Sequence, residues 1–213
     1  MTDIVSPYMN IKQYTKVLLK PYQMNSDIKN NLKTNLEEKV GKKCNKNGYI
    51  DKVHKIIEYG DGEMPPENLS GCAIYSTVYL CRICMPMEHT IIIGQVQVIN
   101  PVLILAKNGP IYIFIPRENI DNSVFDVTND FMHIKSKQKL KTNQYVKVHI
   151  VNKKINKGDS QINTMGRLID IASENEVKKY FGSVIVNNNT FDMDEKDHIE
   201  NKEMTAGGSN FII

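Results

Sequence analysis

The chain has 213 residues and a mass of 24.3 kDa, which corresponds to one large domain or two small ones. Its hydrophobic content of 41% and charged content of 24% are ordinary for a globular protein and exclude fibrous and collagen-like classes. The formal net charge of +3 is unevenly divided, with +2 on residues 1–90, +5 on residues 91–186 and −4 on residues 187–213, so the middle of the chain favours an anionic partner such as a nucleic acid.

The first part of the chain, up to about Met87, predicts strand, helix, strand, loop and strand. The helix is indicated by four apolar residues that recur at every fourth position: Ile28, Leu32, Leu36 and Val40. Asn25 or Ser26 can cap its start, and Gly41 is placed to end it. The turn formers of Gly60–Asn68 predict a loop. The strands are expected at Tyr14–Leu19, Gly48–Ile57 and Gly71–Arg82.

The second part, from about Glu88 to Val186, predicts mostly strands. Lys107–Pro110 is a hairpin-turn signal, and Asp121–Asp130 is expected to be a polar loop. Five strands of this length and spacing fit a small closed barrel of the oligonucleotide-binding (OB) type. They are expected at His89–Asn100, Val102–Ala106, Ile111–Pro116, Gln144–Ile155 and Gln161–Ile171. The last part, Asn187–Ile213, contains an acidic run and favours a mobile tail.

The chain is not expected to enter a membrane or to be secreted. Residues 89–106 carry no formal charge, but polar residues interrupt them and the apolar side chains alternate as in a strand. The N-terminus lacks the charged start and apolar core of a signal peptide, so an intracellular location is expected. In that location the four cysteines should be reduced thiols: Cys44, Cys72, Cys81 and Cys84.

Several short motifs follow one another in a fixed order. In the first part these are Gly48-Tyr-Ile-Asp51, Gly60-Asp-Gly-Glu63 and Ser70-Gly-Cys-Ala-Ile-Tyr-Ser-Thr-Val-Tyr79, before a strand that ends in Cys84-Met-Pro86. In the second part they are Gly94-Gln-Val-Gln-Val-Ile-Asn100 and Gly109-Pro-Ile-Tyr-Ile-Phe-Ile-Pro-Arg117. Together they resemble the stalk subunit of multisubunit DNA-directed RNA polymerases, the family of the seventh subunit of eukaryotic polymerase II and of its archaeal counterpart.

The resemblance covers roughly residues 14–171 and extends to a viral branch of the family. Leu19-Lys-Pro21, followed by Asp27-Ile-Lys29 and Asn31, is similar to the small poxvirus polymerase subunit of the same lineage. The 27 Ile, 24 Lys and 23 Asn have A/T-rich codons and indicate an A/T-rich genome. A version encoded by a large DNA virus is therefore expected.

The resemblance implies an α+β protein with two domains and a tail. Residues 1–87 would form a truncated ribonucleoprotein-like tip domain that docks on the polymerase core, residues 88–186 an all-β OB barrel that contacts emerging RNA, and residues 187–213 an acidic mobile tail. The implied partners are the polymerase core subunits and nascent single-stranded RNA, with a helical stalk partner left open. A viral protein of this kind would act in the virion and host cytoplasm, and a cellular one in the nucleus.

The loop between the second and third predicted strands is the expected docking element, because it lies where the family's tip lies. Met64-Pro65-Pro66 would supply a stiff apolar centre, since proline limits the conformational freedom that is lost on binding. The alternative is a plain hairpin connector. The predicted docking residues are Gly60, Asp61, Gly62, Met64, Pro65 and Pro66.

A lysine tract between Phe131 and Gly158 contains no Asp or Glu and is the candidate RNA-binding surface. Lysines neutralise phosphates of any sequence, although a solvated face in a Lys-rich protein is the simpler alternative. The first four lysines are spaced by two, so an extended segment would place them on one side. The candidates are Lys135, Lys137, Lys139, Lys141, Lys147, Lys153 and Lys154.

Tyr112 and Phe114 share one face of a predicted strand, opposite three isoleucines, and the sequence does not decide which face lies inward. Packing in the core is the default for both, and stacking of Tyr112 on an RNA base is the functional alternative. The preceding strand offers no aromatic residue, which favours weak electrostatic binding over tight stacking.

The sequence shows no catalytic constellation, and neither a cofactor nor a metal is expected. Cys81 and Cys84 are spaced as half of a zinc site, but a second pair is missing and the two would point to opposite faces of a strand. The histidines show no paired spacing, and no phosphate loop or nucleophile elbow is present. Two functions remain: a non-catalytic polymerase subunit, or a free-standing OB-fold RNA-binding protein of translation or RNA decay.

Overall fold

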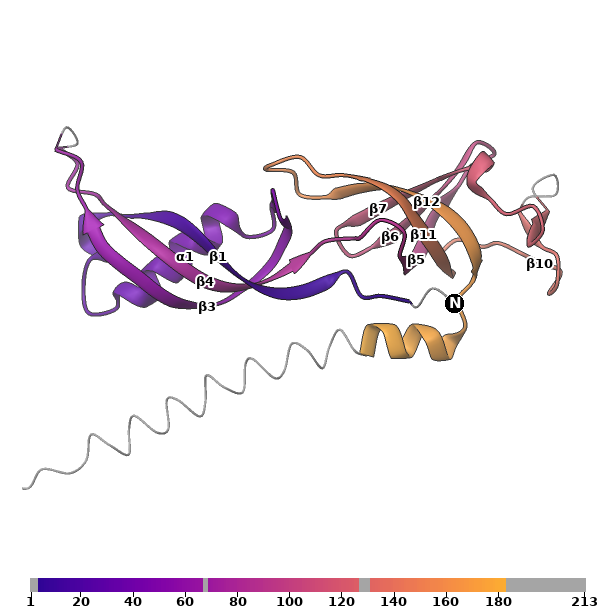
Figure 1. Ribbon diagram of the computed structural model, residues 1–213, viewed down its shortest axis with the longest axis horizontal. Coiled ribbons are helices and arrows are strands. Elements are labelled where there is room, and N and C mark those ends of the chain that lie inside the picture. Colours follow the sequence, from indigo (N-terminus) through magenta and orange to yellow (C-terminus); the bar gives the residue numbers. More distant parts are fainter. Residues whose placement is uncertain (1–3, 67–68, 127–130, 183–213) are drawn as a thin grey trace, which may run out of the picture.

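The computed structural model describes residues 4–66, 69–126 and 131–182, and these form a mostly β protein. The N-terminal half is a four-stranded sheet with one helix, and the C-terminal half is a closed five-stranded barrel. They lie end to end along the long axis of the molecule (Figure 1). The tail 187–213 lies outside the described residues.

The N-terminal sheet has the strand order β1-β4-β3-β2, and all of its neighbours are antiparallel. One face packs on helix α1 and contains the core of this half, in which Leu19, Leu32 and Ile50 are fully buried. The bounds of the elements are β1 (Tyr8–Leu19), η1 (Pro21–Gln23), α1 (Ile28–Val40), β2 (Cys44–Asn45), β3 (Gly48–Glu63) and β4 (Ala73–Cys84). The first strand therefore begins six residues earlier than the sequence predicts, because Tyr8 already pairs with Cys84.

The predicted helix is confirmed and Gly41 ends it as predicted, but its N-cap differs from the prediction. Leu32 and Leu36 are buried in the core, and the two ends of the apolar stripe pack against it. The N-cap is Asp27, without a side-chain capping bond, rather than Asn25 or Ser26. The Asn25 side chain instead accepts a hydrogen bond from the Asp27 backbone N–H at 2.9 Å, which organises the turn before the helix.

The predicted loop at Gly60–Asn68 is wrong in its first half. Gly60–Glu63 belongs to β3, where Gly62 pairs with Tyr75 of β4. The register shifts between Tyr59 and Gly62, so Gly60 and Asp61 form a bulge, which is a common reason for glycine within a strand. The Tyr75 ring lies so close to Gly62 that an added Cβ would be 2.7 Å from it.

The five predicted barrel strands are confirmed, with small shifts of their ends. Their order is β11-β12-β7-β6-β5, and β5 pairs back onto β11, so the barrel closes. The β12–β7 pair is parallel and the other neighbours are antiparallel, which is consistent with an OB-like barrel. The strands are β5 (Ile91–Ile99), β6 (Leu103–Asn108), β7 (Ile111–Pro116), β11 (Tyr145–Lys154) and β12 (Ile162–Ile171).

Isoleucine and valine side chains fill the barrel, and two glycines let its walls approach. Ile111, Ile113 and Ile115 are fully buried. A Cβ on Gly166 would overlap the side chain of Val148, and one on Gly94 would be 3.0 Å from Ile113. The interior of a small barrel is only just wide enough for its side chains. The space that a side chain at Gly94 or Gly166 would need is occupied by Ile113 and Val148.

A small sheet and a helix decorate the barrel. The polar loop predicted at Asp121–Asp130 contains a short strand, which joins the order β10-β9-β8. Residues 174–182 are helical, which the sequence analysis does not predict. Within the described part of the chain, no helix is long and apolar enough to cross a membrane. The further elements are η2 (Arg117–Asn119), β8 (Phe125–Asp126), β9 (Met132–His133) and β10 (Gln138–Lys139).

The two halves are joined by backbone hydrogen bonds and by shared core residues. The Cys44 N–H donates to the Asp159 carbonyl at 2.7 Å, and the Gly158 N–H donates to the Cys44 carbonyl at 2.8 Å. Cys44, Tyr49 and Cys84 of the N-terminal sheet belong to the hydrophobic cluster of the barrel. The hydrophobic core of the barrel therefore extends into the end of the sheet.

Candidate nucleic-acid interface

Three of the predicted lysines surround one hollow at the outer end of the barrel. The hollow measures about 540 Å³ and is open to solvent. Lys137, Lys139 and Lys141 line it together with four polar residues that carry no charge: Gln138, Thr142, Asn143 and Gln144. A basic hollow lined by amides and a hydroxyl is suited to phosphate groups, which accept hydrogen bonds and carry negative charge.

The expectation that Lys135, Lys137, Lys139 and Lys141 follow one extended segment is wrong. Residues 134–137 form the turn between β9 and β10, and Lys137 has a φ of 50°. The segment 131–141, which carries these lysines, is anchored by the buried side chains of Phe131 and Leu140. The Leu140 N–H donates a hydrogen bond to the Phe131 carbonyl at 3.3 Å and so closes the segment into a loop. A turn rather than a strand thus brings the lysines around one hollow.

His133 ties the lysine segment to the barrel wall. Its Nδ1 accepts a hydrogen bond from the Ser136 backbone N–H at 3.2 Å, so the ring proton lies on Nε2. Nε2 is 3.2 Å from Oδ1 of Asp170 on β12, and the ring meets Phe125 edge to face at 5.3 Å between centroids. The role of His133 could not be predicted from sequence spacing, because its partners are 3 and 37 positions away.

The other lysines of the tract have different surroundings. Lys147 is mostly buried and forms ion pairs with Glu176 at 3.2 Å and Asp170 at 3.6 Å. Lys153 donates a hydrogen bond to the Pro86 carbonyl at 3.1 Å. Lys153 and Lys154 end the ten-residue strand β11, about 30 Å from its start near the hollow. The structure therefore does not gather the seven predicted lysines on one surface.

Glu176 is the second residue that sequence reasoning missed, although a signal existed. Ser173 and Glu176 bond reciprocally: the Ser173 N–H donates to the Glu176 carboxylate at 2.8 Å, and the Glu176 N–H donates to the Ser173 hydroxyl at 3.4 Å. This is a capping box, and its spacing predicts the start of a helix. The hydrogen bonds from Ser173, followed by the interaction with Lys147, lower the pKa of Glu176.

Tyr112 and Phe114 face outward, so the default of core packing was wrong for both. The buried isoleucines of β7 occupy the inner face, and Phe114 is 39% exposed. Tyr112 is half-buried, with Lys107 Nζ 5.0 Å from the centre of its ring. Both aromatics lie on the third barrel strand, beside the second, on the face with which OB folds bind oligonucleotides.

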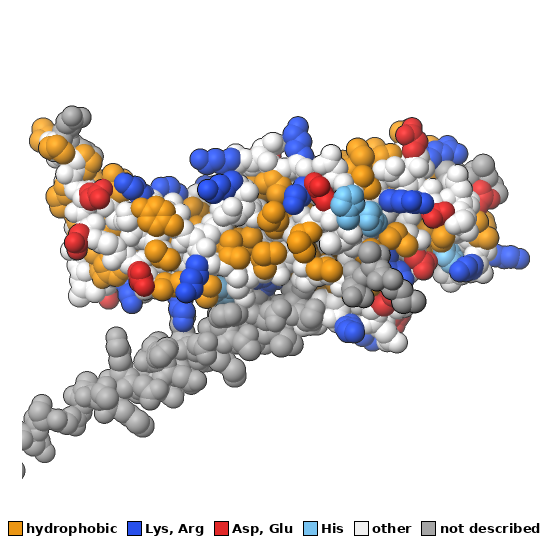
Figure 2. Space-filling view, viewed as in Figure 1, with side chains coloured by type: hydrophobic (Ala, Val, Ile, Leu, Met, Phe, Trp, Pro, Cys, Tyr) orange, Lys and Arg blue, Asp and Glu red, His pale blue; other side chains and the backbone are white. Residues whose placement is uncertain are grey.

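The predicted docking residues lie at the opposite end of the molecule from the lysine hollow. The β3–β4 hairpin projects there, away from the barrel (Figure 1). Met64 is 59% exposed and Leu69, on the other side of the same hairpin end, is 98% exposed. In Figure 2 hydrophobic side chains gather at this tip, whereas Lys and Arg side chains form several separate groups along the body of the molecule.

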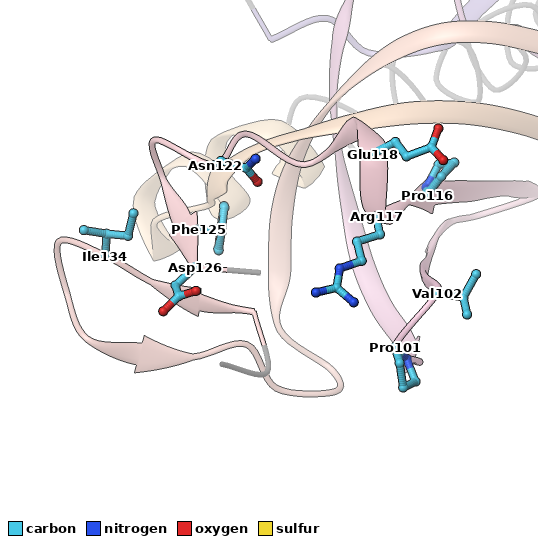
Figure 3. A pocket seen from close by; sticks show the side chains of 9 residues that line it. All are labelled: Pro101, Val102, Pro116, Arg117, Glu118, Asn122, Phe125, Asp126 and Ile134. Atoms are coloured by element: carbon cyan, nitrogen blue, oxygen red, sulfur yellow. The ribbon is translucent and has the colours of Figure 1, made fainter. Parts of the chain in front are cut away.

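A further open pocket of about 900 Å³ lies beside the barrel end (Figure 3). It is walled by the β5–β6 turn, by η2 and by the small sheet, and the Arg117 side chain points into the space between them. Its lining mixes apolar and charged groups without a metal-ligand or nucleophile set. The lining residues are Pro101, Val102, Pro116, Arg117, Glu118, Asn122, Phe125, Asp126 and Ile134.

Cys81 and Cys84 point to opposite faces of β4, as predicted. Cys81 lies in the core of the N-terminal sheet and Cys84 in the cluster of the barrel, and both are fully buried. Burial raises the pKa of Cys81 to about 11, which disfavours the thiolate that a metal needs. Among the described residues, no group of three or more His, Cys, Asp or Glu side chains is placed to hold a metal ion.

The fold and the basic hollow define a barrel protein with a surface suited to polyanions. The chain is 39% identical over 193 residues to a protein of Acanthamoeba polyphaga mimivirus named "Putative DNA-directed RNA polymerase subunit L376", and the match covers 89% of this chain and 97% of the relative. No protein-family model matches the chain. The chain therefore belongs to the family of viral DNA-directed RNA polymerase subunits to which this mimivirus protein belongs.

Proposed function

We propose that the chain is a non-catalytic stalk subunit of a viral DNA-directed RNA polymerase, which docks through its N-terminal half and contacts nascent RNA with its barrel. The match to the mimivirus polymerase subunit along nearly the whole chain is the observation that carries the proposal. Residues 1–87 act as the tip domain and residues 88–186 as the OB domain. As part of a viral enzyme, the chain works in the host cytoplasm and in the virion.

Docking on the polymerase core uses the β3–β4 hairpin end with Gly60, Asp61, Gly62, Met64, Pro65 and Pro66. The exposed apolar side chain of Met64 supports this assignment, because covering it removes apolar surface from water, and the two following prolines limit the backbone freedom that is lost on binding. The bulge at Gly60 and Asp61 supports it too, since bulges redirect the end of a strand.

RNA contact uses the lysine hollow first. Lys137, Lys139 and Lys141 provide sequence-independent attraction to phosphates, and Lys135 lies in the same turn. Lys147 has a structural role in this proposal, because its two ion pairs already neutralise it. Tyr112 and the pair Lys153 and Lys154 form a second area of RNA contact at the other end of the barrel.

Copurification tests the docking half of the proposal. Replacing Met64, Pro65 and Pro66 by Gly or Ser should reduce recovery of the large polymerase subunits with the tagged chain, while the circular dichroism spectrum of the isolated variant stays unchanged. A matched control replaces Lys137, Lys139 and Lys141 by Glu, which should leave recovery unchanged. Full recovery of the polymerase with the hairpin variant would contradict docking through this hairpin, and a wild-type chain that copurifies with no polymerase subunit would contradict the stalk role.

A further inference from the structure

A crevice of about 330 Å³ lies where the N-terminal sheet meets the barrel. Three parts of the molecule line it and place seven side chains with hydrogen-bonding or stacking capacity around one space. The sheet supplies Tyr8, Tyr49 and Asp51, the β6–β7 hairpin supplies Lys107 and Tyr112, and the loop before β12 supplies Ser160 and Gln161. The crevice therefore exists only because the two halves pack against each other.

The walls of the crevice are fixed before any ligand arrives. The two backbone hydrogen bonds between Cys44 and residues 158–159 hold the loop before β12 against the sheet. Tyr8 is clamped on its ring by the Arg82 guanidinium, 4.2 Å from the ring centre, and its hydroxyl lies against Gly109. Burial raises the pKa of Tyr8 far above its ordinary value, so the phenol remains a hydrogen-bond donor. Such preorganisation lowers the cost of binding.

Tyr112 and Lys107 form a platform for one nucleotide. They are cross-strand neighbours on the outer face of the barrel, and the Lys107 ammonium lies over the Tyr112 ring, 5.0 Å from its centre. A base that stacks on this face of the ring displaces the flexible lysine side chain, which then reaches the phosphate. An aromatic ring that is half-exposed offers a stacking surface to a base of single-stranded nucleic acid, and an adjacent lysine offers a charge to its phosphate.

Asp51 gives the crevice a hydrogen-bond acceptor whose charge is already compensated. Its carboxylate contacts Lys42 Nζ at 3.0 Å and Arg82 Nε at 3.7 Å, and its side chain is 26% exposed. The two cations reduce repulsion of a phosphate, while a carboxylate has four lone-pair sites and can still accept further hydrogen bonds. Guanine presents two neighbouring N–H donors on its Watson–Crick edge, and uracil presents one.

We propose that this crevice binds one guanine nucleotide of single-stranded RNA, with the base stacked on Tyr112 and its N–H edge toward Asp51. The site rests on the proposed RNA-binding function and adds base preference to it. The lysine hollow attracts RNA of any sequence, because ammonium groups recognise only phosphate charge. The crevice between the sheet and the barrel would instead favour one base at the position next to the N-terminal half.

Fluorescence anisotropy on the full chain tests the site with two 12-nucleotide RNA probes, oligouridine and the same probe with one central guanosine. The guanosine probe should bind about fivefold more tightly, the size expected for one additional hydrogen bond to the Asp51 carboxylate, since uracil can stack on Tyr112 as well. Tyr112→Leu should remove this difference. Asp51→Asn, which keeps size and one acceptor oxygen, should reduce it. The control Phe114→Leu changes the next outward aromatic on β7, outside the crevice, and should leave the difference intact.

The triple variant Lys137→Glu, Lys139→Glu and Lys141→Glu separates this site from the proposed function. It should weaken both probes together and leave their ratio unchanged. Equal affinity of the wild-type chain for the two probes, or a ratio that survives Tyr112→Leu, would overturn the crevice site. If the triple variant still weakened both probes, the proposed RNA contact would stand without the crevice. Wild-type chain that binds neither probe would overturn both.

Discussion

Charge reversal of Lys137, Lys139 and Lys141 should abolish most of the salt dependence of RNA binding. These three lysines line one hollow, whereas Lys147 is neutralised by two carboxylates and Lys153 donates to a backbone carbonyl. Three neutralised phosphates at about −0.7 each predict a slope of about −2 in log K against log salt. Between 50 and 200 mM salt, the affinity of the wild-type chain should then fall about 20-fold.

The assay is fluorescence anisotropy of the full chain with oligouridine over a salt series. A matched control reverses three exposed lysines of the N-terminal half, Lys12, Lys20 and Lys29, which gives the same change in net charge at another place. The hollow variant should lose most of the slope and keep only the part due to the second contact area at Lys153 and Lys154, whereas the control variant should keep nearly all of the slope. Equal loss of affinity in the two variants would show that net charge alone drives binding and would refute a localised RNA surface in the hollow.

Three further predictions concern the packing that positions these surfaces. Asn108→Ala should lower the free energy of unfolding in urea by about 1–3 kcal/mol, because the buried Asn108 amide donates to the Ile93 carbonyl at 2.7 Å and to the Tyr180 hydroxyl at 2.8 Å. Gly109→Ala should cost about 1–3 kcal/mol in the same measurement, since φ is 55° and the new Cβ would overlap the Tyr8 hydroxyl. Burial raises the pKa of Cys81 to about 11, so this thiol should resist a thiol reagent at pH 8 until the chain unfolds. The free energy of unfolding should also fall as the pH rises from about 9 to about 11, because in this range the thiol loses its proton in the unfolded chain but keeps it in the folded chain.

Hydrophobic periodicity was sufficient to predict most of the strands and the helix. The apolar stripe of α1 and the alternation of β7 and β12 depend on local spacing, and the structure confirms them. The glycines at positions 60 and 62 misled the prediction, because the same residues serve loops and strand bulges. Only the cross-strand partner distinguishes the two cases, and here it is the Tyr75 ring over Gly62.

The candidate site was predictable in its composition but not in its geometry. The absence of acids between Phe131 and Gly158 correctly marked a basic segment, but spacing could not show that Lys147 meets Glu176 of a later helix. The inward face of β7 also depended on the whole barrel. The isoleucines and the aromatics of β7 are all apolar, so hydrophobicity alone does not decide which face lies inward. The isoleucines are buried because the barrel interior is narrow: the wall at Gly166 lies so close to Ile113 that only a compact side chain fits there.

The connection between the halves determines what docking at one end does to the other. Residues 85–90 link β4 to β5 and are held at both ends: the Met85 N–H donates to the Pro7 carbonyl at 2.7 Å, and the His89 N–H donates to the Ile150 carbonyl at 2.8 Å. Lys153 adds a hydrogen bond to Pro86 from the barrel side. Cys84, the last residue of β4, is already packed in the barrel cluster, so the connection is not a flexible linker. A partner that fixes the β3–β4 hairpin therefore also fixes the orientation of the barrel, and the lysine hollow at the far end is carried to a defined place in the assembly.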